Sequence, residues 1–195
     1  PTARIDGADI LLEWPIVSSA FPIDEFEIVE GDFTPVGRAK VNYFRVPAGA
    51  VGFHEWKIRA RDIVGNYGDW GEVSIEIKPA GAPTVKAIIQ EDKILISWVA
   101  PSTISLPITE YEIENSTTGE SFGRINATQI VVPPEKTGNH IFRVRSWDTG
   151  GNAGAWGQTS LRVEAPGRVY ITPTVIDNNA LLVWTEPSTI FFPIH

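Results

Sequence analysis

Two histidines recur in this chain at equivalent places, where they could bind a metal or move a proton. His54 and His140 lie 86 positions apart within similar stretches. A metal site needs further ligands, and no second histidine or converging carboxylate recurs with either one. We therefore interpret both as histidines at the edge of a core, bonded to a backbone carbonyl. The sequence predicts no metal site and no cofactor.

An Asp-x-x-Gly-Asn motif also occurs twice, at residues 62–66 and 148–152. Its oxygens would suit calcium, but calcium takes about six to eight oxygen ligands and each motif supplies two such side chains. Glycine and asparagine tolerate positive φ, and an aspartate readily accepts hydrogen bonds from nearby amides. The motif therefore favours a tight turn over a cation site.

Two tryptophans, Trp70 and Trp156, stand in Gly-x-Trp-Gly segments and are the candidate ligand contacts of the chain. An exposed indole in such a loop could stack on a sugar. Because both occur in the same setting, the alternative is a structural ring folded over the end of a domain. Three residues before Pro-Ile are expected to close that end as apolar plugs: Phe21, Leu106 and Phe192.

Catalytic patterns are missing from the sequence. No Gly-x-Ser-x-Gly elbow accompanies a His/Asp pair, and no phosphate loop or dinucleotide fingerprint occurs. Two rows of glutamates, at 25 and 27 and at 110, 112 and 114, alternate along the sequence and so share one face of a strand. A glycosidase instead needs carboxylates that face each other across a cleft. We expect a protein that is not an enzyme.

Charge and composition exclude further partners. Sixteen basic residues against 24 acidic ones give a net charge of −8, the wrong sign for nucleic acid or an anionic membrane. The apolar runs span only a few residues, which argues against membrane insertion. With no cysteine, the fold is built without disulfides.

The chain repeats itself. Tryptophans 14, 98 and 184 each end a similar apolar stretch, and the stretches around His54 and Trp70 return 86 positions later. We expect a domain over 1–79 with a truncated first strand, a domain over 82–164, and the first strands of an incomplete repeat over 167–195. Both ends then fall inside a repeat, so we expect the polypeptide to continue past His195.

Apolar residues alternate with polar ones throughout the repeats, and no helical stripe is sustained. This pattern predicts an all-β chain of antiparallel sandwiches, each with two sheets over one core. Charges predict strand neighbours: Glu25 and Glu27 should lie beside Arg59 and Arg61. In the second repeat, Glu110 and Glu112 should lie beside Arg143 and Arg145.

These residues resemble the fibronectin type III domain, an immunoglobulin-like β-sandwich. The landmarks are a tryptophan in the second strand, an aromatic-x-Ile in the third (Phe26, Tyr111), and a late alternating strand before a Gly-rich loop. The family usually has a tyrosine at the start of that late strand, and His54 and His140 replace it here.

A narrower likeness is to repeats of bacteriophage tail-tip, host-specificity and tail fibre proteins. It rests on Trp98…Pro101…Leu106-Pro-Ile, Tyr111-Glu-Ile, and Arg145-x-x-Asp-x-x-Gly-Asn…Trp156. The likeness implies non-catalytic spacer modules of a virion tail, with other tail proteins and a host receptor or glycan as partners. The alternative is an accessory array of a secreted bacterial polysaccharide-degrading enzyme or adhesin, which would place the protein outside the cell.

Overall fold

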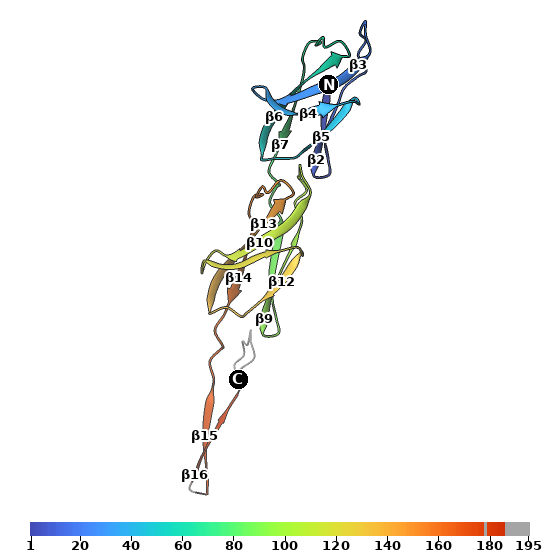
Figure 1. Cartoon of the computed structure of the whole chain (residues 1–195). Helices are drawn as coiled ribbons and strands as arrows, with labels where there is room; N and C mark the ends of the chain where they lie inside the picture. The colour runs from blue at the N-terminus through green and yellow to red at the C-terminus, as the bar shows by residue number, and fades with distance from the viewer. Residues whose placement is uncertain (178, 186–195) are drawn as a thin grey trace. The chain divides into compact units, whose positions relative to one another are not determined.

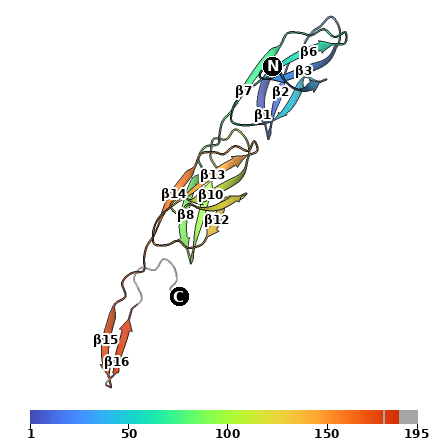
Figure 2. The ribbon, with the colours of Figure 1, turned by 60° about the vertical axis from the view of Figure 1, so that its left-hand side comes forward.

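The computed structural model describes residues 1–177 and 179–185, and the regular structure in this part is β-strand (Figures 1 and 2). No helix among these residues is long and apolar enough to cross a membrane. The two complete repeats form two β-sandwiches with the same strand order. The prediction of an all-β chain of tandem antiparallel sandwiches is confirmed.

The first sandwich packs a three-stranded antiparallel sheet against a four-stranded one. The smaller sheet has the order β1-β2-β5, and the larger has the order β4-β3-β6-β7. Its strands are β1 (Thr2–Asp6), β2 (Asp9–Glu13), β3 (Ile23–Glu30), β4 (Thr34–Ala39), β5 (Tyr43–Pro47), β6 (Gly52–Asp62) and β7 (Gly71–Ile77).

The second sandwich repeats this order as β12-β9-β8 and β11-β10-β13-β14. Its strands are β8 (Thr84–Gln90), β9 (Lys93–Val99), β10 (Ile108–Asn115), β11 (Glu120–Ile125), β12 (Gln129–Val132), β13 (Gly138–Asp148) and β14 (Gly157–Val163). In register, Val85 faces Trp98. Thr2 faces Glu13, the residue before Trp14, so Pro1 is the counterpart of Val85.

The core of each sandwich lies between its two sheets, where the alternating apolar residues meet. Ile10 and Leu12 of β2, and Trp14 directly after it, are at most 6% exposed. Trp14 contacts Phe26 across the core at 5.2 Å between ring centroids, and Trp98 contacts Tyr111 in the same way at 5.4 Å. Burial of this apolar area, at about 25 cal/mol per Å², is the main source of stability. Trp14 and Trp98 are therefore core residues.

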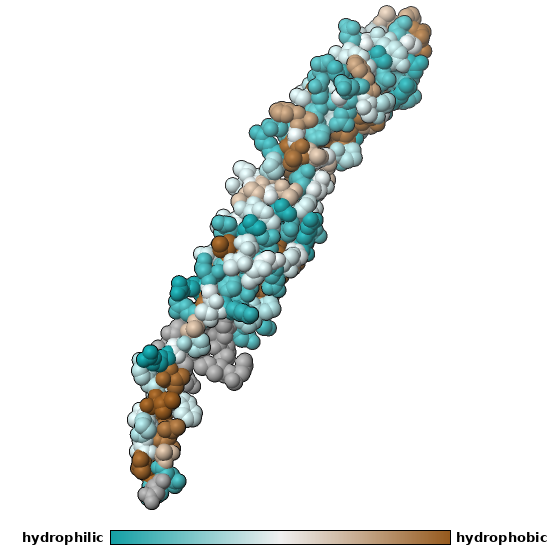
Figure 3. Space-filling model, turned by 90° about the vertical axis from the view of Figure 1, so that its left-hand side faces the viewer, coloured by the Kyte–Doolittle hydropathy of each residue, from teal (hydrophilic) through white to brown (hydrophobic). Residues whose placement is uncertain are grey.

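The third repeat contributes a hairpin, β15 (Ile171–Ile176) and β16 (Asn179–Trp184). Its apolar side chains are exposed, with Trp184 at 66%, and they form the brown surface of that hairpin in Figure 3. Two strands cannot enclose a core by themselves. Phe192 and the end of the predicted 167–195 segment lie outside the described residues.

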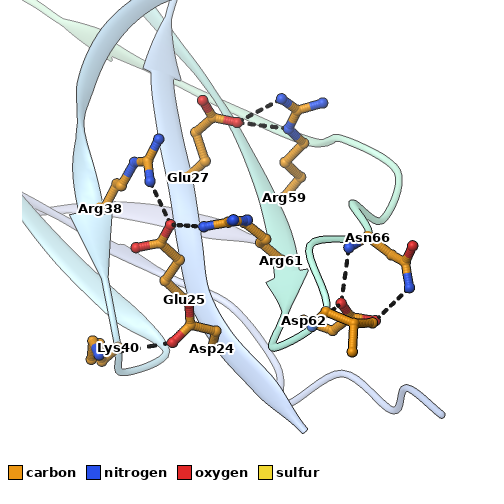
Figure 4. Close-up of polar contacts among 10 residues, drawn as sticks. Asp24, Glu25, Glu27, Arg38, Lys40, Arg59, Arg61, Asp62 and Asn66 are labelled. Carbon is orange, nitrogen blue, oxygen red and sulfur yellow. Dashed lines mark hydrogen bonds and ion pairs between the residues drawn. The ribbon is translucent and has the colours of Figure 1, made fainter. Parts of the chain in front are cut away.

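The charged faces confirm the predicted neighbours in the first sandwich (Figure 4). Arg59 donates to Glu27 at 2.7 Å and Arg61 to Glu25 at 3.2 Å. The same Glu25 oxygen also accepts from Arg38 of β4, so these pairs tie three neighbouring strands together. Each exposed pair contributes only about 0.2–1 kcal/mol, and its larger effect is on strand register.

The corresponding prediction for the second sandwich is half right. Arg145 donates to Glu112 at 2.9 Å, as expected, but Arg143 donates to Glu114 at 3.0 Å and not to Glu110. The cause is a difference between the repeats. The counterpart of Arg61 is Trp147, so the second charged pair moves two residues along both strands.

Candidate functional site

The Asp-x-x-Gly-Asn motifs form closed turns. Asp62 Oδ1 accepts hydrogen bonds from the amides of Val64 and Asn66, and Oδ2 accepts one from the Asn66 side chain at 2.9 Å. Figure 4 shows these bonds to Asn66. Asp148 is held in the same way by Gly150 and Asn152. Both carboxylates are occupied by donors of their own loop, which confirms the turn and gives calcium no open ligand set.

These contacts also set the charge of the first turn. Burial of Asp62 disfavours its ionised form and would raise its pKa. The hydrogen bonds from Asn66, Val64 and Gly65 outweigh that effect, and the pKa of Asp62 is lowered. The carboxylate therefore stays ionised and structural at neutral pH.

The two histidines bond to backbone carbonyls four residues earlier. His54 Nε2 lies 2.8 Å from the Ala50 oxygen, and His140 Nε2 lies 2.7 Å from the Lys136 oxygen. The other ring nitrogen, Nδ1, lies 3.4 Å from Glu30 in the first case and 3.2 Å from Asn115 in the second. The predicted role at the edge of the core is confirmed. The described residues contain no cluster of metal-ligating side chains.

Trp70 lies against the charged, outward face of the larger sheet in the first sandwich. The Arg59 guanidinium lies 4.2 Å from its ring centroid and 4.0 Å from that of Tyr67. Phe33 packs edge-on against the same indole at 5.6 Å. Arg59 thus bonds Glu27 while stacking between two rings.

Trp156 is placed in the same way in the second sandwich. Arg145 and Arg143 lie 4.5 and 5.0 Å from its ring centroid, and the indole is half-buried. Both indoles therefore pack on their own module, as the structural alternative expects, although the surface that they cover is the outward face of the larger sheet. They pack on arginines that already project outward from alternating positions of β6 and β13, because the loop enters β7 or β14 along that face.

The expected apolar plugs differ between the repeats. Leu106 is 1% exposed and belongs to a buried core, whereas Phe21 is 48% exposed. The loop that carries Phe21, residues 15–21, is exposed along its whole length. The plug interpretation is therefore wrong for Phe21. Leu106 is buried in one cluster with Ile10, Leu12 and Trp14.

A groove of about 460 Å³ opens at the end of the first sandwich, beside this exposed loop. We call it the end groove. Its floor is the edge of the core, with Trp14, Phe26 and Ile58. Its walls are residues 15–19 on one side and Gly68–Gly71 on the other, and Pro1 also lines it.

The end groove has an apolar floor and polar groups around it. Of its polar side chains, Asp62 and Asn66 are bonded to each other, and Arg59 is held by Glu27. Ser18, Ser19 and Asp69 also line it. Apolar floors with backbone polar groups at the rim suit an extended peptide or a flat ring. Sequence reasoning found Trp70 here but missed the groove, whose walls are short loops without a motif of their own.

No family model matches the chain. No curated protein matches it either.

Several solved structures are similar in part. Fibronectin(III)-like modules of Clostridium thermocellum CbhA are 21% identical over 81% of this chain and 86% of theirs, with a TM-score of 0.32. The chicken interferon gamma receptor alpha chain is 10% identical, covering 84% of this chain and 96% of that one, at 0.37. The Clostridium perfringens spore cortex lytic enzyme SleM is 18% identical over 50% of this chain and 34% of that one, at 0.40. The assignment of the fold rests on the strand order described above.

Proposed function

We propose that this chain is a series of non-catalytic spacer modules from a bacteriophage tail-tip or tail fibre protein. One observation carries the proposal: the recurring chemistry-bearing residues are used inside their own module. The histidines bond backbone carbonyls, the aspartates close turns, and the loop tryptophans pack on arginines. The same residues recur in both repeats and make the same internal contacts. This supports a role in which each module acts as a rigid unit.

The virion setting rests on the motif likeness and on composition. The Trp…Leu-Pro-Ile…Tyr-Glu-Ile stretch and the Arg-x-x-Asp-x-x-Gly-Asn…Trp stretch occur together in the second repeat. A cysteine-free sandwich folds in a reducing cytoplasm and keeps its structure outside the cell. In this setting the modules would hold a receptor-binding element of the tail at a distance, with other tail proteins as neighbours.

An antibody raised against the second sandwich tests the setting. Negative-stain images of virions should show the label on the tail tip or fibres. A serum absorbed with the purified chain is the matched control and should remove the label. Labelling of the capsid, or of no virion component, would refute the virion role.

The second candidate is an accessory array of a secreted polysaccharide-degrading enzyme or adhesin, with the modules in contact with a glycan. It is favoured by the rings of Tyr67 and Trp70 at the end groove, since aromatic rings are the usual platforms for sugars. Glycan-array binding that is lost on Trp70→Ala and kept on Trp156→Ala would support this version. Binding unchanged by both substitutions would remove it.

A further inference from the structure

The two sandwiches also differ in the space beside the Gly-x-Trp-Gly segment. In the second sandwich this space holds the segment that leads into β8, residues 80–83. The Ala155 amide donates to the Ala80 carbonyl at 2.9 Å, and the Gly81 amide donates to the Thr103 carbonyl at 2.9 Å. The leading segment therefore lies between two loops and bonds both, and Ala80 is 6% exposed.

The same two loops in the first sandwich form the walls of the end groove. The counterpart of the loop at 101–106 is the loop at 15–21, and the counterpart of Gly154–Gly157 is Gly68–Gly71. The Gly68 amide bonds the Ala60 carbonyl just as the Gly154 amide bonds that of Ser146. Among the described residues, the amide of Asp69, the counterpart of Ala155, donates no hydrogen bond to a backbone carbonyl outside the strand ladders.

Glycines at equivalent positions of the two sandwiches differ in what lies against them. A Cβ built on Gly154 would lie 2.6 Å from Ser146 Oγ and 2.9 Å from the Ala80 carbonyl oxygen, and one on Gly157 would lie 1.9 Å from that of Pro83. The leading segment therefore requires a glycine at 157, and at 154 it requires one together with Ser146. A Cβ on Gly68 would meet only the Ala60 oxygen, at the ordinary distance of 3.9 Å. Gly68 thus leaves room that nothing in the first sandwich uses.

We propose that the end groove is the seat of an extended segment joined to Pro1, the counterpart of residues 80–84. Such a segment would extend β1 backwards, accept a hydrogen bond from Asp69, and cover Trp14 and the exposed loop at 15–19. Small and proline residues fit there, because the walls already approach closely in the second sandwich. The leading segment is then part of the module that follows it. This inference rests on the serial-array part of the proposed function and is independent of the virion setting.

The test adds residues to the whole chain. In one version, Pro-Ala-Gly-Ala-Pro-Thr, copied from residues 79–84, is joined in front of Pro1. The matched control carries Pro-Asp-Gly-Asp-Pro-Thr, since a carboxylate at the Ala80 position would have to be buried without a partner. Amide hydrogen exchange of Asp69 is followed by NMR in the original chain and in both extended chains.

We expect exchange of the Asp69 amide to slow by about tenfold with the alanine extension and to stay unchanged with the aspartate extension. Gly68→Ala provides a second arm. It should leave the original chain folded with unchanged exchange, and it should abolish the slowing in the extended chain. Equal rates in all chains would overturn the proposal, and so would equal slowing by both extensions. Because exchange of the Asp69 amide reports on the first sandwich alone, either of these results would contradict this inference without contradicting the proposal of serial spacer modules.

Discussion

The two kinds of tryptophan should respond differently to truncation, and the second sandwich offers the sharper comparison. Trp98 is 5% exposed and contacts Tyr111 in the core. Truncating a buried tryptophan to alanine typically costs about 3–5 kcal/mol, because a cavity remains. We therefore expect Trp98→Ala to lower the free energy of unfolding of this sandwich by about that amount.

Trp156 makes a weaker contribution by the same reasoning. Its ring is half-buried and faces two guanidinium groups, at 4.5 and 5.0 Å. Each such contact is worth about 0.5–1 kcal/mol near a surface, so Trp156→Ala should cost roughly 1–2 kcal/mol. The difference of about 2 kcal/mol corresponds to roughly a thirtyfold change in the folded-to-unfolded ratio.

Native-state hydrogen exchange of β13 amides at increasing urea measures both values in the whole chain, without relying on tryptophan fluorescence. Val131→Ala, at an apolar position that is 56% exposed, is the control and should change little. If Trp156→Ala costs as much as Trp98→Ala, the placement of Trp156 on the outward face is wrong. If Trp98→Ala costs less than about 1 kcal/mol, the two-sheet core around it is wrong.

Three further outcomes follow from the turns and the sandwich edges. His140→Phe keeps a ring in place but leaves the Lys136 carbonyl without its donor, so urea denaturation should show a loss of about 1–3 kcal/mol, and no loss would contradict the edge role. The lowered pKa of Asp62 means that its turn adds stability above the unfolded pKa of about 4 and loses it as pH falls through the lower folded value. The protection factors of the Val64 and Asn66 amides, which donate to this carboxylate, should therefore fall in acid, while Asp62→Asn should show low protection of these amides at every pH. Gly157→Ala places a Cβ 1.9 Å from the Pro83 oxygen. It should lower the free energy of unfolding of the second sandwich by about 1–3 kcal/mol, seen as a lower thermal midpoint. In the matched Gly71→Ala, the Cβ meets the ring of Pro1 at 3.1 Å and the Ile58 oxygen at the ordinary distance of 3.7 Å, so this substitution should cost less.

Much of the fold was predictable because strand periodicity is local. Ile10, Leu12 and Trp14 share a face whatever surrounds them, since side chains of a strand alternate. The turns at Asp62 and Asp148 were predictable for the same reason, because their donors and acceptors lie within four residues. The pairing of Arg143 with Glu114 was missed: Trp147 at the counterpart of Arg61 is visible in the sequence, but the new partner also depends on the register between strands far apart in the sequence.

By itself, the sequence determined which residues alternate, which loops close on themselves, and that the unit recurs. Only the tertiary structure decided where the loop tryptophans rest, because their arginine partners come from a different strand. It also decided that one sandwich has its end filled and the other has it open. That difference depends on which segment lies between two loops, and no local pattern in either loop records it.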